Sequence, residues 1–140
     1  MYYIVGDIGN TTTRICLLNK NYKINHSVII DTKKILIKSY IKKIFKKLLK
    51  LNTKKKILFS SVVPSAYSRI KFYLKELNLE AIEIKRLNLK KLIKINIKNI
   101  KQVGSDRIVN SIEGKKFNNC LIIDFGTATT FDIVKNGIYE

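Results

Sequence analysis

The chain contains few of the residues that mark several classes of protein. Its 140 residues include two cysteines, one proline, one histidine and no tryptophan. Cys16 and Cys120 lie far apart in the sequence, which argues against a disulfide framework or a zinc site and for a reducing compartment. No apolar run approaches the ~20 residues that span a bilayer, and the N-terminus lacks the features of a signal peptide. We therefore expect a cytoplasmic protein with no membrane partner.

Negative charge is also scarce. Asp and Glu number 10 against 28 Lys and Arg, so the formal net charge is +18. The cations comprise 24 Lys and only 4 Arg, and 24 Ile and 13 Asn accompany them, which is the composition that an AT-rich genome produces by default. Proteins that bind nucleic acids favour Arg for bidentate contacts. We therefore favour codon bias over selected nucleic-acid binding and expect no specific nucleic-acid partner.

The rare acids and glycines occur together. The chain has only five Asp and six Gly. Hydrophobic residues make up 46% of the chain, which suffices for a folded core. In a chain that drifts towards Lys and Asn, the positions that keep Asp and Gly are the first candidates for function. In three pairs the two residues lie two positions apart: Asp7 and Gly9, Gly104 and Asp106, and Asp124 and Gly126.

Hydrophobic periodicity predicts an α/β chain. Lysines line one face of the helix predicted over 34–51. Such a helix can bind a membrane, but packing over a sheet is commoner and we favour it. Residues 85–103 show no clean period. Helices are predicted over 34–51, over 65–77 with Ser65 as the N-cap, and over 105–116. Strands are predicted over 2–6, 13–18, 22–30, 56–63, 80–84, 120–123, 131–134 and 138–140.

Two segments, 4–12 and 121–129, share one pattern. Each has an apolar strand, then Asp-x-Gly, then Asn or Thr, then another strand. Glycine lets the backbone approach a phosphate closely, while hydroxyl and backbone N–H groups donate to its oxygens. The Asp can hold a hydrated cation. One such segment is often an ordinary turn, but two copies at matching strand ends indicate loops that bind a nucleotide.

A third segment, Gly104-Ser105-Asp106-Arg107, opens the last predicted helix. Asp106 can be the N-cap of that helix. Alternatively, it can be the base that takes a proton from a substrate hydroxyl as this hydroxyl attacks a phosphate. Arg107 would then bind an anionic group or the developing charge. The sequence leaves both alternatives open.

Together these motifs resemble those of the type III pantothenate kinases, in the order found in that family. The resemblance rests on Asp7–Thr11, Ser60–Pro64, Gly104–Arg107 and Asp124–Asp132. The family belongs to the acetate and sugar kinase, Hsp70 and actin superfamily. The resemblance therefore implies an α/β, ribonuclease H-like domain over residues 1–117, with a mixed sheet flanked by helices. Residues 118–140 would begin a second such domain that is truncated, and we expect a fragment of the enzyme or a decayed gene product.

The resemblance also implies a reaction. A kinase of this family phosphorylates the primary hydroxyl of pantothenate with ATP and Mg²⁺ and a monovalent cation, K⁺ or ammonium, as the first step of coenzyme A biosynthesis. These enzymes are cytoplasmic homodimers. Asp106 would be the catalytic base and Asp124 the ligand of the monovalent cation. Pantothenate would contact Gly104, Ser105, Asp106 and Arg107. ATP would contact Asp7, Ile8, Gly9, Asn10, Thr11, Thr12, Thr13, Arg14 and Thr127.

Three positions depart from the family pattern. Ser105 stands where the family has Ala, and Ile97 and Ile100 stand where it commonly has a substrate-contacting Tyr and a Pro. Two other functions remain as alternatives. One is a non-catalytic relative or gene remnant of the regulatory accessory type. The other, which we favour least, is a basic nucleic-acid-binding module.

Overall fold

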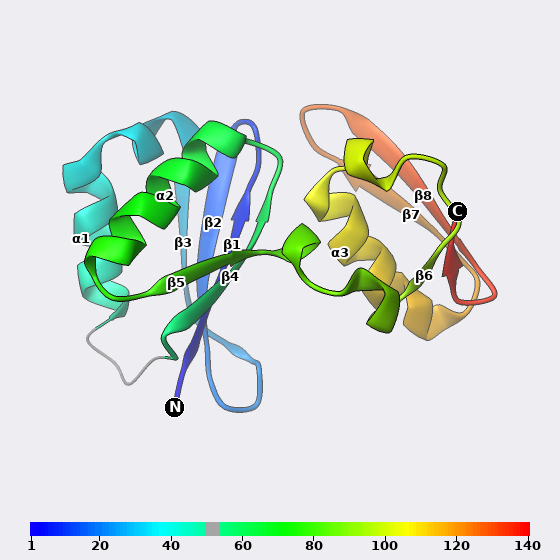
Figure 1. The fold of residues 1–140 in the computed structure, drawn as a ribbon, viewed down its shortest axis with the longest axis horizontal. Coiled ribbons are helices and arrows are strands. Elements are labelled where there is room, and N and C mark those ends of the chain that lie inside the picture. The colour runs from blue at the N-terminus through cyan, green and yellow to red at the C-terminus, as the bar shows by residue number, and fades with distance from the viewer. Residues whose placement is uncertain (50–53) are drawn as a thin grey trace. The chain divides into compact units, whose positions relative to one another are not determined.

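The computed structural model describes residues 1–49 and 54–140. The described chain divides into two compact units, Met1–Glu83 and Ile84–Glu140, each of which is described by itself below (Figure 1). The second unit groups the last helix with the strands that follow it. The repeat of the strand–loop–strand pattern that begins near residue 118 remains our predicted start of a second domain.

The first unit is built on a five-stranded mixed sheet with the order β3-β2-β1-β4-β5. The first three strands are antiparallel neighbours, and β4 and β5 run parallel to β1. The mixed sheet predicted for this part of the chain is therefore confirmed. Its strands are β1 (Tyr3–Ile8), β2 (Thr12–Leu18), β3 (Ile24–Asp31), β4 (Lys56–Ser61) and β5 (Glu80–Glu83).

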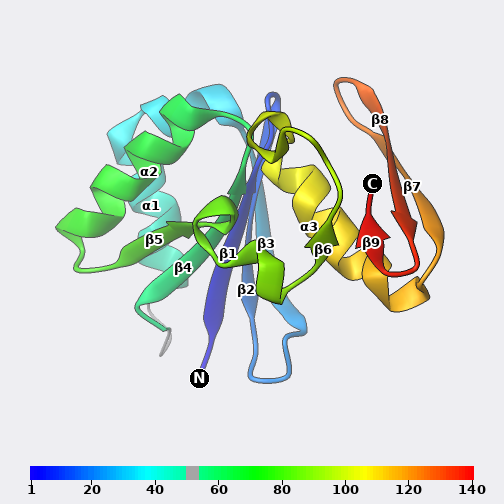
Figure 2. The same ribbon diagram turned by 45° about the vertical axis from the view of Figure 1, so that its right-hand side comes forward.

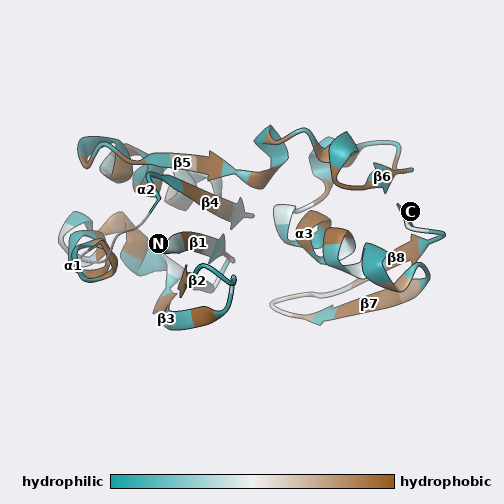
Figure 3. Cartoon of the chain, turned by 90° about the horizontal axis from the view of Figure 1, so that it is seen from below, coloured by the Kyte–Doolittle hydropathy of each residue, from teal (hydrophilic) through white to brown (hydrophobic). Residues whose placement is uncertain are grey.

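Two helices, α1 (Lys38–Leu48) and α2 (Pro64–Glu76), cover one face of this sheet (Figure 3). Helix α1 buries Ile41, Phe45 and Leu48 in the core and exposes its lysines, so it packs as we favoured. Within the described residues, no helix is long and apolar enough to cross a bilayer.

The predicted start of the first helix is wrong. Thr32–Leu36 forms a 3₁₀ helix that begins after Asp31, whose Oδ1 accepts a hydrogen bond of 2.9 Å from the Lys33 backbone N–H. Ile37 then takes an extended conformation, with φ −90° and ψ 104°, and α1 follows it. This break was hidden because apolar residues continue at helical spacing across it. The predicted end of the helix, at residues 50 and 51, lies outside the described residues.

The predicted cap of α2 is also wrong. Pro64 is the first helical residue and Val63 is the N-cap, with no hydrogen bond from its side chain. Proline suits this first position because the N–H that it lacks would have no partner inside the helix, and its fixed φ is already helical. Ser65 therefore lies inside the first turn rather than before it.

The second unit holds a four-stranded sheet with the order β6-β9-β8-β7. Helix α3 (Ser105–Gly114) packs against β7 and β8 (Figure 2). The Asn136-Gly137 turn joins β8 to β9, and both of its residues have positive φ, as the hairpin signal predicted. The strands are β6 (Lys94–Ile95), β7 (Cys120–Phe125), β8 (Thr129–Lys135) and β9 (Ile138–Tyr139).

The stretch without a clean period, residues 85–103, is a series of short elements. The 3₁₀ turns Ile84–Arg86, Leu89–Lys91 and Ile100–Gln102 surround the short strand β6. Between them the chain delivers Ile93 and Val103 to a second core that also contains Ile108 and Tyr139. Single buried residues separated by turns produce neither a helical nor a strand period, which explains why no helix or strand was predicted here.

The first core predicts a cost for a methyl group at Gly6 in β1. A Cβ atom there would lie 2.3 Å from Cε1 of Phe59, which is fully buried in the neighbouring strand β4. The Gly6→Ala variant should lose about 1–3 kcal/mol in free energy of unfolding, because the ring has to move within a close-packed core. Urea denaturation measures this loss.

The matched control is Gly126→Ala, where the nearest atom to an added Cβ is 3.7 Å away. Its free energy of unfolding should stay within about 0.5 kcal/mol of the unchanged protein. Equal stability of the two variants would contradict the packing described for Gly6.

Candidate phosphate and substrate site

The tip of the β1–β2 hairpin is held by Thr32, the residue that directly follows β3 and begins the 3₁₀ helix. The Gly9 N–H donates to the Thr12 carbonyl at 2.9 Å, which closes the tip. Thr32 donates from Oγ1 to the Gly9 carbonyl at 2.7 Å and from its backbone N–H to the Thr11 carbonyl at 2.9 Å. Its Oγ1 also lies 3.0 Å from Oγ1 of Thr13. The loop is therefore fixed by the protein itself before any ligand binds.

The predicted ATP-binding residues of this hairpin divide by exposure. Asp7 and Arg14 face each other across the β1–β2 register, and both are exposed. Ile8 and Thr13 are fully buried, so any contact that they make with a ligand would come from their backbone. The remaining predicted residues of the tip are exposed or half-buried: Gly9, Asn10, Thr11 and Thr12.

The predicted substrate segment forms the start of α3. Gly104 is the N-cap, in an extended conformation and with no side-chain hydrogen bond. The N-cap alternative for Asp106 is therefore wrong, since Asp106 lies in the first turn. Its Oδ1 accepts a hydrogen bond of 2.8 Å from the Arg107 backbone N–H. Ser105 is buried, whereas Asp106 is half-buried and open to a ligand.

Arg107 joins this segment to the strand β8. Its Nε donates to Oδ1 of Asp132 at 2.8 Å, and Nη2 lies 2.6 Å from the same oxygen. Nη2 also donates to the Phe131 carbonyl at 2.9 Å. Two motifs that are distant in sequence, Gly104–Arg107 and Asp124–Asp132, thus meet inside the second unit. Sequence reasoning gave Asp132 no role of its own beyond membership of the second motif.

Asp132 is a buried carboxylate, only 1% exposed. Tyr139 donates from Oη to the same oxygen, Oδ1, at 2.5 Å. The hydrogen bond to Asp132 raises the pKa of Arg107, so the guanidinium stays charged. Burial, and then the bond to Asp132, raise the pKa of Tyr139 to about 12. Oδ2 of Asp132 has no hydrogen-bond partner among the described residues.

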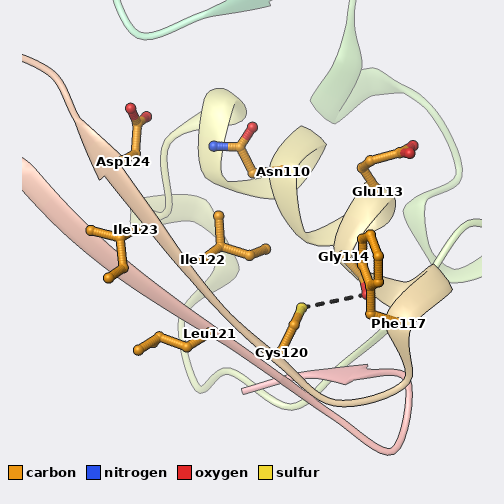
Figure 4. A pocket seen from close by; sticks show the side chains of 9 residues that line it. All are labelled: Asn110, Glu113, Gly114, Phe117, Cys120, Leu121, Ile122, Ile123 and Asp124. Atoms are coloured by element: carbon orange, nitrogen blue, oxygen red, sulfur yellow. Dashed lines mark hydrogen bonds between the residues drawn. The ribbon is translucent and has the colours of Figure 1, made fainter.

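The β7–β8 loop carries the other predicted ligands. Asp124 is half-buried near the end of β7, opposite Thr130, and Thr127 is exposed in the turn between the strands. Asp124 also lines a cavity of about 570 Å³ together with Asn110 and Glu113 of α3 (Figure 4). Carboxylate and amide oxygens are the donors that hard cations prefer. Asp124 and Glu113 lie at opposite ends of this cavity with Asn110 between them, so the three side chains do not surround a single cation position (Figure 4).

No group of three or more His, Cys, Asp or Glu side chains that could hold a metal occurs in residues 1–49 and 54–140. A cation at Asp124 would therefore take its other ligands from amides, backbone carbonyls, water or a bound phosphate.

A second cavity in this unit contains the two positions that depart from the family pattern. It has a volume of about 780 Å³, and Ile97 and Ile100 both line it. Most of its other lining residues are apolar, among them Leu87, Leu89, Ile93 and Ile138.

Solved structures define the class of the fold. The ethanolamine utilization protein EutJ from Carboxydothermus hydrogenoformans matches with a TM-score of 0.58 and 11% identity, over 100% of this chain and 50% of that chain. A ROK family protein from Streptococcus pneumoniae matches with a TM-score of 0.50 and 16% identity, over 100% and 48%. The chain therefore has the α/β fold of the sugar kinase, ROK and actin-like ATPase group, which confirms the predicted fold class.

Sequence comparison identifies the family within that class. The model of the type III pantothenate kinase family matches residues 3–140, so the chain belongs to this family, as its motifs indicated. The type III pantothenate kinase of Pelagibacter ubique is 46% identical over 139 residues, which cover 98% of this chain and 56% of that protein. That of Desulforapulum autotrophicum is 35% identical and covers 94% and 53%. The chain thus spans about half the length of these curated relatives.

The surroundings of Tyr139, which include its hydrogen bond to Asp132, predict that the phenol of Tyr139 ionises at an unusually high pH. Burial disfavours the charged form of the phenol, and ionising Tyr139 would also place a second negative charge beside Asp132, so the pKa of Tyr139 is raised from 10.0 to about 12. The part of stability that comes from this shift is fully present below about pH 10 and is lost as the pH rises through about 12. Subtracting the ultraviolet titration of Tyr139→Phe from that of the unchanged protein should leave a phenol that ionises near the upper value. A difference curve centred near pH 10 would contradict the contact.

Proposed function

We propose that the protein carrying this chain transfers the γ-phosphoryl group of ATP to the primary hydroxyl of pantothenate, which yields 4′-phosphopantothenate for coenzyme A biosynthesis. The observation that carries the proposal is the start of α3. There, an accessible carboxylate, Asp106, is followed directly by a guanidinium, Arg107, that is anchored on a buried acid. Phosphoryl transfer to an alcohol needs a base and a fixed positive charge more than it needs covalent chemistry.

Asp106 acts as the base in this proposal. Among the described residues it accepts one hydrogen bond, at Oδ1, from the backbone of its own helix. That bond orients the carboxylate and leaves Oδ2 for the hydroxyl of the substrate. As the hydroxyl oxygen attacks phosphorus, its proton passes to Oδ2 of Asp106.

Arg107 binds an oxygen of the substrate or of the transferring group. Its Nε and Nη2 are held by Asp132 and Phe131, whereas Nη1 donates to none of the described residues. The side chain as a whole is 34% exposed, and in this proposal Nη1 is the nitrogen that binds the ligand. Gly104 and Ser105 bring the backbone of the helix start to the same substrate.

The two phosphate-type loops contact ATP. At the β1–β2 tip, Asp7, Gly9, Asn10, Thr11, Thr12 and Arg14 supply backbone and polar side chains, and Ile8 and Thr13 supply backbone only. Thr127 of the β7–β8 loop contacts ATP as well. Asp7 would hold Mg²⁺, and Asp124 would hold K⁺ or ammonium. When bound, these cations supply positive charge that offsets the charge of the phosphate oxygens.

We also propose a cytoplasmic homodimer. The unpaired thiols of Cys16 and Cys120 support a reducing compartment. The homodimer follows from the family resemblance alone, and light scattering of the purified protein tests it.

Removal of the proposed base tests the function. With pantothenate, ATP, Mg²⁺ and K⁺, the protein expressed from its own gene should release ADP in a pantothenate-dependent reaction. Asp106→Asn should lower kcat by ~10²–10⁴-fold, the usual contribution of a general base. A coupled assay of ADP release measures both proteins.

The control is Glu76→Gln on α2, which removes a carboxylate that forms an exposed salt bridge with Lys38. It should retain full activity. Binding of ATP without pantothenate-dependent turnover would overturn the proposal in favour of a non-catalytic relative.

Substitution at Asp124 tests the cation. The rate should rise with K⁺ at constant ionic strength, and Asp124→Asn should shift this dependence to higher K⁺ concentration because a charged ligand becomes a neutral one. The measurement is kcat/KM against K⁺, balanced with a large organic cation that cannot enter the site. An unchanged K⁺ dependence in Asp124→Asn would contradict the assignment.

A further inference from the structure

Asp132 concentrates its contacts on one oxygen. Nε of Arg107 at 2.8 Å, Nη2 of Arg107 at 2.6 Å and Oη of Tyr139 at 2.5 Å all meet Oδ1. The carboxylate is buried next to the apolar second core, to which Tyr139 belongs. A buried carboxylate is costly unless it is paired, and replacing such a pair by apolar residues is often neutral for stability. Stability alone therefore does not account for this arrangement.

The arrangement does restrict Arg107. Two of its three guanidinium nitrogens are used on β8, one of them twice, because Nη2 also donates to the Phe131 carbonyl. Ser111, one turn further along α3, donates from Oγ to the Arg107 carbonyl at 2.8 Å. The side chain and the backbone of Arg107 are therefore both fixed. Only the edge that carries Nη1 remains for a ligand.

We propose that Asp132 is a positioning residue for the acceptor substrate: it holds the Arg107 guanidinium in one orientation, with Nη1 directed to an oxygen of that substrate. This inference deepens the proposed function and rests on it. A flexible arginine would lose side-chain entropy on binding, whereas one that is already held by Asp132 binds its ligand at lower cost. Asp132 does not touch the substrate itself.

The kinetic test separates positioning from a purely structural role. Asp132→Asn, in the protein expressed from its own gene, should raise the KM for pantothenate by about 10-fold or more, the factor for a charge-assisted hydrogen bond. The KM for ATP should not change, and kcat should change less than the pantothenate KM. A structural defect alone would lower the active fraction, and thus kcat, at unchanged KM.

Tyr139→Phe is the matched control. It removes one donor to the same buried oxygen but leaves both contacts between Arg107 and Asp132 in place. The pantothenate KM of this variant should stay within about 2-fold of that of the unchanged protein, because Arg107 remains held by Asp132. A 2-fold change in KM corresponds to less free energy than one hydrogen bond contributes. An increase equal to that of Asp132→Asn would overturn the inference, since any disturbance of the cluster would then suffice.

A double-mutant cycle tests the route of the effect. Arg107→Gln should itself raise the pantothenate KM. If Asp132 acts through Arg107, adding Asp132→Asn to Arg107→Gln should produce little further increase. Increases that multiply in the double variant would show that Asp132 acts by another route and would overturn the inference.

A spectroscopic measurement is independent of turnover. The chain has only four arginines, so the Nε–H region of a ¹⁵N spectrum is simple, and Arg107→Gln assigns the signal of interest. The Arg107 Nε–H should exchange slowly with solvent in the unchanged protein and quickly in Asp132→Asn. The backbone amide spectrum of each variant reports whether it is folded; should Asp132→Asn fail to fold, Asp132→Ser takes its place with the same expectation.

The kinetic and the spectroscopic measurements distinguish a failure of the proposed function from a failure of the role proposed for Asp132. No turnover in the unchanged protein would overturn the proposed function, and the exchange rate of the Arg107 Nε–H would then decide the anchoring by Asp132 alone. Slow exchange that persists in Asp132→Asn would overturn the anchoring. Fast exchange of the Arg107 Nε–H in Asp132→Asn, together with an unchanged pantothenate KM in that variant, would overturn the positioning role of Asp132.

Discussion

The ion pair between Arg107 and Asp132 is the constraint on which the second unit depends. Asp132 on β8 is only 1% exposed, and burying a carboxylate is costly unless a cation pairs with it. The cation comes from the first turn of α3. The pair fixes the start of α3 against the β7–β8 hairpin. It thereby fixes Asp106 and the hairpin in one body, and these carry the proposed base and the proposed cation ligand.

In the first unit, hydroxyl groups rather than charges hold the β1–β2 tip in place. A loop that receives phosphate oxygens must keep its donors turned outward while its own carbonyls stay satisfied. Thr32 does this from below the β1–β2 tip, where it bonds to the carbonyls of Gly9 and Thr11 and to the hydroxyl of Thr13. In both units, residues that would not touch a ligand hold the candidate ligand-binding groups in place. Such preorganisation is what phosphoryl transfer requires of a protein.

Local patterns predicted much of this structure. The strands of the first sheet and the Asn136-Gly137 hairpin follow from alternation and turn chemistry, and the pairs of Asp and Gly marked both loops and the start of α3. Contacts between distant residues were not predictable, because nothing in the pattern links Thr32 to Thr13 or Arg107 to Asp132. For residues 85–103 no element was predicted for another reason: their core residues lie between short turns, which produce no hydrophobic period. At the start of α2 two local signals compete, the preference of serine for the N-cap and that of proline for the first helical position. Pro64 takes the first helical position, and Ser65 therefore lies inside the helix.

The most direct test of the central claim is the identity of the product. ³¹P NMR of the protein expressed from its own gene, incubated with ATP, Mg²⁺, K⁺ and pantothenate, follows every phosphorus atom of the reaction. We expect a new phosphate monoester on the primary hydroxyl of pantothenate, formed in equal amount to ADP. Consumption of ATP that yields only inorganic phosphate, or no consumption of ATP, would contradict it.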